Sequence, residues 1–317
     1  MAIEYGLLEQ EEHSAKEWGL AGGVSGVSEN VLRPDGQWDD FLPEFESQWK
    51  DGFDTYACVT FSALNCIETL VKVRYDKDIN KSDRFVAKMS DTRCGYGNWL
   101  YKVADTIKEQ GSCDEVDYPF SDGLVCETYY AEIPEDLKLK AKLLIEDYDI
   151  KWEWAYNYTL QEGLTYAPLQ VTIWAYGKRD SNDIYQHPGT TKSNHAVMLY
   201  GYKEGEYWKI YDHYANKFKK LAWDYPMTSQ LKFEIIKKLT QPPMPTIKVD
   251  NDTLVQDVED SGAIGMVLDD KIIVDDLAKV LATWQIRNNG NTVGKVRSLK
   301  KDEWDSFQKM NISKQPI

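Results

Sequence analysis

Residues 54–72 read DTYACVTFSALNCIETLVK and set one cysteine, Cys58, where a short loop turns into a helix. Unpaired N–H groups and the helix dipole favour an anion at such a helix start, so we expect a lowered pKa for the Cys58 thiol. A lone core cysteine is usually inert, so this interpretation depends on a partner histidine elsewhere. Apolar residues recur after Cys58 at helical spacing and predict an amphipathic helix that buries one face; they are Val59, Ala63, Leu64, Ile67, Leu70 and Val71.

The composition is that of a globular protein. Of 317 residues, 42% are hydrophobic and 13% aromatic, and this length predicts about two domains. The net charge is −15 without a cluster of lysine or arginine, which argues against nucleic acid and membranes as partners. Residues 1–12 lack a basic start and an apolar core, and no run of 18 apolar residues occurs, so we expect neither a signal peptide nor a membrane span. The expected site of synthesis is the cytoplasm.

The cysteines predict free thiols. Their number is odd in a long chain without an export signal, although a pair that involves Cys94 or Cys113 stays open. Neither a CxxC pair nor an HExxH motif occurs, so no metal and no other cofactor is expected. The five are Cys58, Cys66, Cys94, Cys113 and Cys126.

The first 240 residues predict an arm followed by one domain. Residues 1–47 are rich in glycine, proline and acidic residues, which predicts an ordered, irregular N-terminal arm; the alternative is a propeptide. Residues 48–240 carry helices early and antiparallel strands late, which predicts an α+β fold of two lobes with a cleft between them. The expected helices are 82–89 with Ser82 as N-cap, 100–110 ended by Gly111, and 133–146, and the expected strands are 169–174, 194–202 and 207–211.

A second, smaller domain is expected after a proline-rich linker. Residues 241–246 contain three prolines, which extend neither a helix nor a central strand. Residues 247–317 predict a small α/β or α+β domain with two helices and with strands at 265–268, 271–274 and 293–296. No catalytic constellation occurs in this part, and its role is open; binding an assembly partner is one expectation.

Two later motifs supply a histidine and a carboxylate. NHAV at residues 194–197 begins an expected strand with His195, and YWKIYD at residues 207–212 ends in Asp212. Cys58 lies 137 positions before His195 (195 − 58), and papain-type enzymes separate these residues by about 130–150 positions. ACVTFSA at residues 57–63 resembles the Cys-Trp-Ala-Phe-Ser-Ala segment of papain-like cysteine peptidases, and the histidine and aspartate motifs are similar to theirs.

This resemblance implies a papain-like two-lobed fold and hydrolysis of a peptide or protein substrate through a thioester acyl-enzyme. It implies Cys58 as nucleophile, His195 as general base and then acid, and Asp212 as the residue that orients the imidazole. Gln48 matches the glutamine whose side-chain amide helps to form the oxyanion hole. The residues that match the glycine-rich substrate-binding segment are Gly95, Gly97 and Asn98.

The sequence also departs from the family pattern. Gln48 lies ten positions before Cys58 instead of the usual six, and Val59 stands where tryptophan is usual. The third member is Asp212 and not asparagine, and His213-Tyr214-Ala215 replaces the tryptophan-rich motif that follows it. The arrangement resembles most the divergent papain-like peptidases of tailed-phage and bacterial genomes.

Two alternatives stay open. One is a catalytically inert papain-like fold used for binding or as a structural protein, incorporated into a phage particle. The other is a cell-wall peptide hydrolase with the same thiol chemistry. The acidity of the larger part would favour basic substrates, although a surface average does not describe one pocket.

Overall fold

The computed structural model describes residues 6–8, 30–214 and 217–238, together with the backbone of four strands between residues 245 and 298. The chain divides into two compact units, Met1–Lys238 and Leu239–Ile317. Among the described residues, no helix combines the length and the apolar character that crossing a membrane requires.

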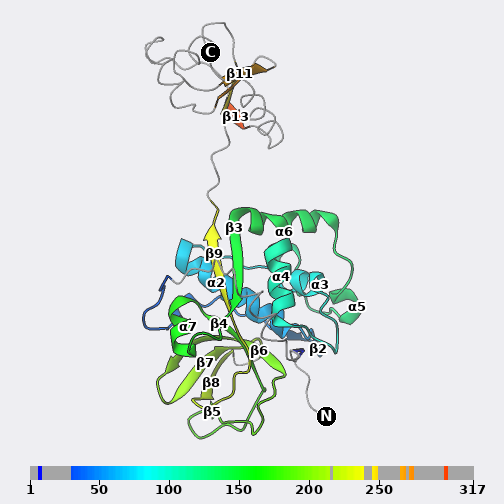
Figure 1. The fold of residues 1–317 in the computed structure, drawn as a ribbon. Helices are drawn as coiled ribbons and strands as arrows, with labels where there is room; N and C mark the ends of the chain where they lie inside the picture. The colour runs from blue at the N-terminus through cyan, green and yellow to red at the C-terminus, as the bar shows by residue number, and fades with distance from the viewer. Residues whose placement is uncertain are drawn as a thin grey trace, which may run out of the picture. The chain divides into compact units, whose positions relative to one another are not determined.

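Helices form one lobe of the first unit, and its 18-residue helix α2 (Cys58–Tyr75) has the other helices of the lobe on one side (Figure 1). The short helices η1 (Asp39–Phe41) and α7 (Leu160–Tyr166) contact α2 and the sheet respectively. The remaining helices of this lobe are α3 (Asp83–Met89), α4 (Leu100–Gln110), η2 (Glu115–Asp117), α5 (Cys126–Tyr129) and α6 (Glu135–Asp147).

Local signals located α3 and α4 correctly. Ser82 caps α3, and its hydroxyl accepts a hydrogen bond from the backbone N–H of Phe85 at 3.1 Å. The α4 helix spans the predicted residues and ends at Gly111, whose φ of 74° suits glycine. The α6 helix begins two residues later than predicted, because Pro134 precedes its first turn.

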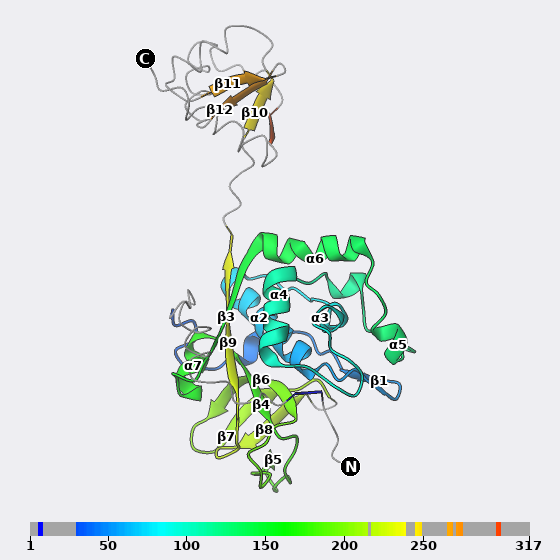
Figure 2. The same cartoon turned by 45° about the vertical axis from the view of Figure 1, so that its right-hand side comes forward.

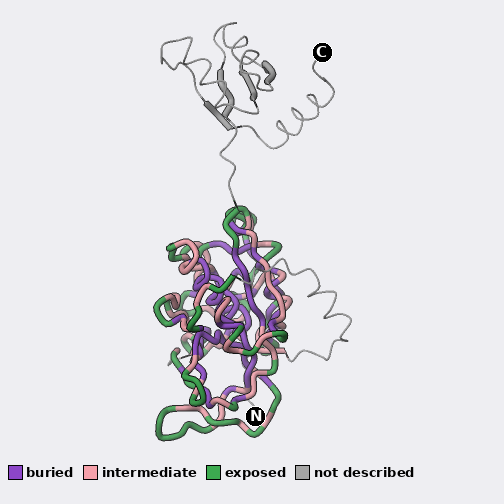
Figure 3. Tube along the Cα trace, turned by 60° about the vertical axis from the view of Figure 1, so that its left-hand side comes forward, coloured by how far each residue is buried: buried purple, intermediate pink, exposed green. Residues whose placement is uncertain are grey.

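The central helix is not amphipathic, and that prediction was wrong. Every residue from Cys58 to Val71 is buried. The reason is that α2 packs against α3 and α4 on one side and against strands of the sheet on another. The buried segments run through the middle of this unit in Figure 3. Because α2 is buried from its first residue, it holds Cys58 at a fixed position between the two lobes.

The second lobe is built on a seven-stranded sheet in the order β3-β9-β4-β6-β7-β8-β5. All neighbours are antiparallel except β5 and β8. Figure 2 shows β3 and β9 rising beside the helical lobe, while β6, β7 and β8 lie below α2. The strands are β3 (Tyr148–Trp154), β4 (Leu169–Ile173), β5 (Ile184–Tyr185), β6 (His195–Lys203), β7 (Tyr207–Tyr211), β8 (Phe218–Ala222) and β9 (Gln230–Lys237).

The predicted strands at 169–174, 194–202 and 207–211 correspond to β4, β6 and β7. Sequence analysis missed β3, β8 and β9, which carry charged residues within the strand. In β3, YDIKWEW, apolar and charged residues alternate strictly, so period-two patterning could have found it.

The second unit contains a four-stranded antiparallel sheet in the order β11-β12-β10-β13. Its strands are β10 (Pro245–Lys248), β11 (Gly265–Leu268), β12 (Lys271–Val274) and β13 (Val296–Ser298). Pro245 belongs to β10, so the predicted linker overlaps this strand; proline is acceptable as the first residue of a strand. The two helices expected in this unit lie outside the described residues.

Buried carboxyl groups lie between α2, α3 and η2. Glu68 accepts a hydrogen bond from the backbone N–H of Lys81 at 2.7 Å, and the Asp83 carboxyl is hydrogen-bonded to Glu46. Burial raises the pKa of Glu68 and Asp83 well above their usual values, and neighbouring carboxylates add to this. Burial and Glu46 also raise the pKa of Glu115 to about 7.

We expect these carboxyl groups to stabilise the fold most at low pH and to stabilise it less as the pH rises. The folded state holds their protons more tightly than the unfolded chain does. The stabilisation is therefore complete below the unfolded pKa values near about 4 and is lost as the pH rises through the folded values, about 7 for Glu115. We expect the free energy of unfolding, measured with urea between about pH 4 and 8, to change less with pH in Glu115→Gln than in wild type. The two changes should differ by no more than about 3 kcal/mol. Glu109→Gln, exposed on α4, should keep the wild-type dependence; equal slopes in wild type and Glu115→Gln would contradict the assignment.

Candidate active site

A β-hairpin places Gln48 close to the start of α2. Strands β1 (Trp49–Lys50) and β2 (Phe53–Asp54) pair antiparallel, and Asp51 and Gly52 at the turn both have positive φ, 51° and 83°. The backbone N–H of Thr55 donates to the carbonyl of Gln48 at 3.0 Å. The hairpin takes up most of the ten positions between Gln48 and Cys58. Gln48 therefore lies beside Thr55, only three positions before the cysteine.

Cys58 is the first residue of α2 and is fully buried. Gln170 on β4 holds this turn of the helix, because its Nε2 donates to the Val59 carbonyl and the Ser62 hydroxyl, both at 2.8 Å. The Cys58 thiol lies within hydrogen-bonding reach of the backbone N–H of Ala196, the residue after His195 on β6. The structure thus brings the two predicted motifs together at the junction of the lobes.

The expected lowering of the Cys58 pKa is not found. Burial raises the pKa of this thiol well above its usual value, and the carboxylates of Asp54 and Asp212 add to the effect. The backbone N–H groups of Ala196 and Val59 act in the opposite direction and do not outweigh burial. The helix start favours the thiolate, but in this closed site desolvation dominates.

His195 and Asp212 form a buried hydrogen-bonded pair. His195 Nε2 lies 2.8 Å from Asp212 Oδ1, and neither side chain is exposed. Burial alone would raise the pKa of Asp212, but the charges of His195 and Lys219 outweigh it and hold the pKa far below its usual value. The ionised carboxylate accepts the Nε2–H proton, which in the neutral imidazole leaves Nδ1 as the proton-accepting nitrogen.

Lys219 is a partner of Asp212 that sequence analysis missed. Its ammonium lies 2.6 Å from Asp212 Oδ2, and the Lys219 side chain is 5% exposed. Tyr176 donates its hydroxyl to the same oxygen, and the backbone N–H of His213 donates to Oδ1 at 2.7 Å. The alternation of FKKLA on β8, in which Lys219 and Leu221 point inward, is a signal that could have indicated it.

Two tyrosine rings lie close to the His195 ring. The Tyr214 ring centroid lies 5.6 Å from that of His195, and the Tyr176 centroid lies 6.1 Å from it. His213 is buried behind the site against Asn65. Burial, with the charges of His195 and Lys219, lowers its pKa to about 3.

The Gln48 side chain is engaged with two neighbours. Its Nε2 donates to Asp54 Oδ1 at 2.9 Å and to the Tyr214 hydroxyl at 2.8 Å. Tyr214 in turn donates to Asp54 Oδ2 at 2.5 Å. Both amide hydrogens are thus committed within this triangle, and a carbonyl oxygen of a substrate would have to replace one acceptor.

The predicted substrate-binding segment contacts the N-terminal part of the chain. The backbone N–H of Asn98 donates to the Gly6 carbonyl, and that of Leu8 donates to the Asn98 carbonyl, both at 2.9 Å. Gly97 has a φ of 70°, and a Cβ there would lie 1.9 Å from the Gly6 carbonyl oxygen, so only glycine permits this approach. The Asn98 side chain is instead buried and bonded to Ser90. Asn98 therefore contacts the N-terminal part of the chain through its backbone and not through its side chain.

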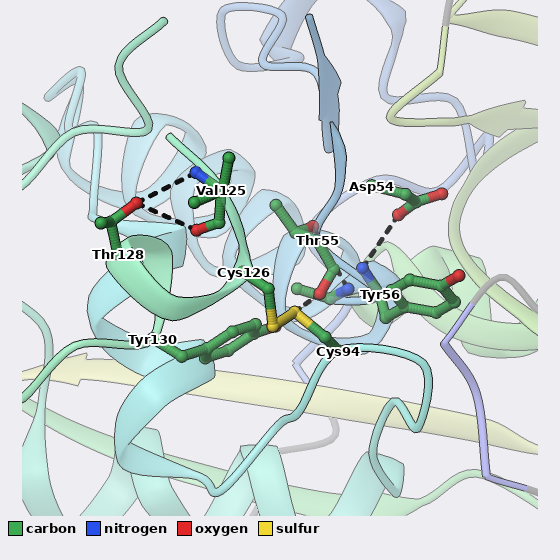
Figure 4. Close-up of a disulfide and its surroundings, with 9 residues drawn as sticks. Asp54, Thr55, Tyr56, Cys94, Val125, Cys126, Thr128 and Tyr130 are labelled. Atoms are coloured by element: carbon green, nitrogen blue, oxygen red, sulfur yellow. Dashed lines mark hydrogen bonds between the residues drawn. A yellow bond between two sulfur atoms is a disulfide. The ribbon is translucent and has the colours of Figure 1, made fainter. Parts of the chain in front are cut away.

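Gly95 lines a nearby pocket next to a disulfide bond between Cys94 and Cys126 (Figure 4). Free thiols were the default expectation, and the pairing of Cys94 that had stayed open is the one found; its Cα atom lies 6.0 Å from that of Cys126. Cys58, Cys66 and Cys113 are free and buried. The bond joins two segments 32 positions apart, a proximity that only the folded chain creates.

Nothing in the described part of the chain forms a metal centre, since it holds no group of three or more histidine, cysteine, aspartate or glutamate side chains suited to an ion. The chemistry on offer there is that of a thiol, an imidazole and a carboxylate. These groups lie between a helical lobe and an antiparallel lobe, an arrangement that defines a cysteine-dependent hydrolase.

A family model described as papain family cysteine protease matches residues 47–226. The match spans more than half of the chain, and the protein belongs to this family of hydrolases. Its α+β fold is accordingly the papain-like one. No curated protein matches the chain significantly.

Several solved structures are similar to it. The bromelain protease from Ananas comosus, in complex with the E64 inhibitor, is 19% identical, with 62% of this chain and 96% of that chain covered and a TM-score of 0.42. The digestive procathepsin L 3 of the Tenebrio molitor larval midgut is 15% identical, with 73% of this chain and 76% of that chain covered and a TM-score of 0.47.

Proposed function

We propose that the protein hydrolyses peptide bonds with Cys58 as nucleophile, His195 as general base and acid, and Asp212 as the group that orients the imidazole. One observation carries this proposal. The His195–Asp212 pair, with Nε2 and Oδ1 2.8 Å apart, is buried, and the backbone N–H of Ala196, the residue after His195, lies within hydrogen-bonding reach of the Cys58 thiol. Because Nε2 donates its proton to Asp212, Nδ1 is the ring nitrogen that takes the proton of the buried thiol and later returns it.

The reaction follows from this arrangement. His195 Nδ1 takes the thiol proton as Cys58 Sγ attacks the carbonyl carbon, and the carbonyl oxygen becomes an oxyanion. As the C–N bond breaks, Nδ1 returns the proton to the leaving amine, and a thioester remains. Water then attacks the thioester with its proton passing to Nδ1, and the proton returns to Sγ as the acid leaves.

The raised pKa of the thiol fits concerted proton transfer. A protonated Cys58 becomes a thiolate only when its proton moves to His195, so the nucleophile forms where the substrate is bound. The backbone N–H of Cys58, in the first turn of α2, lacks an intrahelical partner and suits an oxyanion. Gln48 would add a second donor once the oxyanion replaces Asp54 or Tyr214 as an acceptor.

Hydrolysis of fluorogenic peptides by wild type, Cys58→Ala and Cys66→Ala tests this function. Cys66 is a matched control, because it is a free, buried cysteine on the same helix. Activity should disappear in Cys58→Ala and persist in Cys66→Ala. Absence of cleavage by wild type would instead favour the inert binding fold, and cleavage restricted to peptidoglycan stems would favour the cell-wall hydrolase.

The N-terminal arm is proposed to restrain this activity. Leu7 pairs in parallel with Asn98 at the edge that the family resemblance assigns to substrate, so the arm and a substrate compete for the same backbone groups. Deletion of residues 1–29 should raise kcat/KM by roughly tenfold. Gly6→Ala should act in the same direction, because its Cβ would lie 2.1 Å from the Tyr56 carbonyl oxygen. Unchanged kcat/KM in both variants would show that the arm does not restrain the enzyme.

A further inference from the structure

A pocket of about 770 Å³ is lined in part by Asp54 and Tyr214, which both accept hydrogen bonds from the Gln48 side chain. Its volume is in the range that binds a side chain or a small ligand. Gly95 and the Cys94–Cys126 disulfide form one wall, and Figure 4 shows Asp54 and Tyr56 near the same disulfide. The lining residues are Trp49, Gly52, Phe53, Asp54, Tyr56, Cys94, Gly95, Cys126 and Tyr214.

The chemistry of this lining favours a cation. Among the described residues that line it, Asp54 is the charged one, and the aromatic residues Trp49, Tyr56 and Tyr214 line it as well. The ring of Phe53 packs against Phe120 and Tyr129 instead. The nearby Lys50 points elsewhere, since its ammonium donates to the Phe120 carbonyl at 2.6 Å. A carboxylate among aromatic faces binds ammonium and guanidinium groups by charge-assisted hydrogen bonds and cation–π attraction.

The carboxylate is also close to the reacting groups. Asp54 Oδ1 accepts from Gln48 Nε2 at 2.9 Å, and the negative charge of Asp54 acts directly on the Cys58 thiol. Asp54 accepts from Gln48, Tyr214 and the backbone N–H of Tyr56, which leaves one of about four acceptor positions of a carboxylate for a further donor. A side chain in the pocket would therefore belong to a residue next to the bond that is cleaved.

We propose that this pocket binds a lysine or arginine side chain adjacent to the scissile bond and that Asp54 is the specificity-determining residue. The proposal rests on the peptidase function proposed above and adds its substrate class, peptides with a basic residue at the cleavage site. The net charge of −15 supports the encounter with such peptides.

The first test uses the wild-type protein and two peptides that differ by one acetyl group. One carries lysine next to the scissile bond and the other carries Nε-acetyllysine, and the lysine is placed in turn on either side of the bond. At one of these positions, kcat/KM should be about 30-fold higher for lysine, because acetylation removes the charge that Asp54 recognises.

Variants of the pocket give the second test. Asp54→Asn keeps the shape of the side chain and removes its charge, and it should reduce the lysine preference to within about threefold. Asp51→Asn is the matched control, because Asp51 lies in the same hairpin, is exposed, and does not line the pocket. It should keep the wild-type preference.

The outcomes separate this proposal from the catalytic one. Equal cleavage of both peptides at every position by wild type overturns the substrate preference and leaves the peptidase function intact. An equal loss for both peptides in Asp54→Asn assigns Asp54 a structural role through Gln48 and overturns the preference as well. Cleavage of neither peptide by wild type overturns both proposals. If Asp54→Asn does not fold, the acetylation comparison on wild type still decides the question.

Discussion

Replacing His195 with alanine should lower kcat/KM for peptide cleavage by at least about 10⁴-fold. The variant loses the group that takes the thiol proton, and burial keeps the remaining Cys58 thiol protonated. Catalytic groups that act as a unit are not additive, so Cys58→Ala/His195→Ala should be no slower than Cys58→Ala. Initial rates with one fluorogenic peptide measure all three variants.

Alkylation of the free cysteines gives an independent view of the same pair. In wild type, Cys58 should react faster than Cys66 and Cys113 below about pH 7, because His195 accepts the thiol proton as Sγ attacks the reagent. The advantage should disappear in His195→Ala, as read by peptide mass spectrometry. If Cys58 reacts at the same rate with and without His195, the two residues do not form a catalytic pair.

Lys219→Met should destabilise the fold by about 3–5 kcal/mol and reduce peptide cleavage strongly. The variant leaves the buried Asp212 carboxylate without the ammonium that lies 2.6 Å from its Oδ2. Urea unfolding measures the loss of stability, and kcat/KM measures the loss of activity. Lys220→Met is the matched control, because Lys220 lies next on β8, is exposed, and should change both quantities little.

The double variant Asp212→Asn/Lys219→Met should recover much of both losses. Removing both charges leaves no unpaired ion, and asparagine keeps an oxygen that accepts the proton on His195 Nε2. In the proposed site, Asp212 and Lys219 together act as a neutral group, which would let an aspartate serve where asparagine is usual in the family. A double variant that is as unstable as the sum of the single variants would contradict this coupling.

Much of the fold was readable because its signals are local. The α4 helix begins and ends at the predicted residues because Gly111 stops it, and Ser82 marks the start of α3. The strands that begin at His195 and Tyr207 follow from apolar runs and the glycine turn at Gly205. Charged residues within β8 and β9 concealed those strands, because partners distant in sequence make their burial possible, Asp212 for Lys219 and Glu153 for Lys232.

The sequence by itself determined the order and the long spacing of Cys58, His195 and Asp212, because these lie in motifs of a few residues each. The tertiary structure decided their environment. The pairing of Asp212 with Lys219 depends on the register of β7 and β8, and the approach of Asp54 to Gln48 depends on a hairpin. Burial, which reverses the expected shift in the thiol pKa, is likewise a sum over many distant residues that no local motif contains.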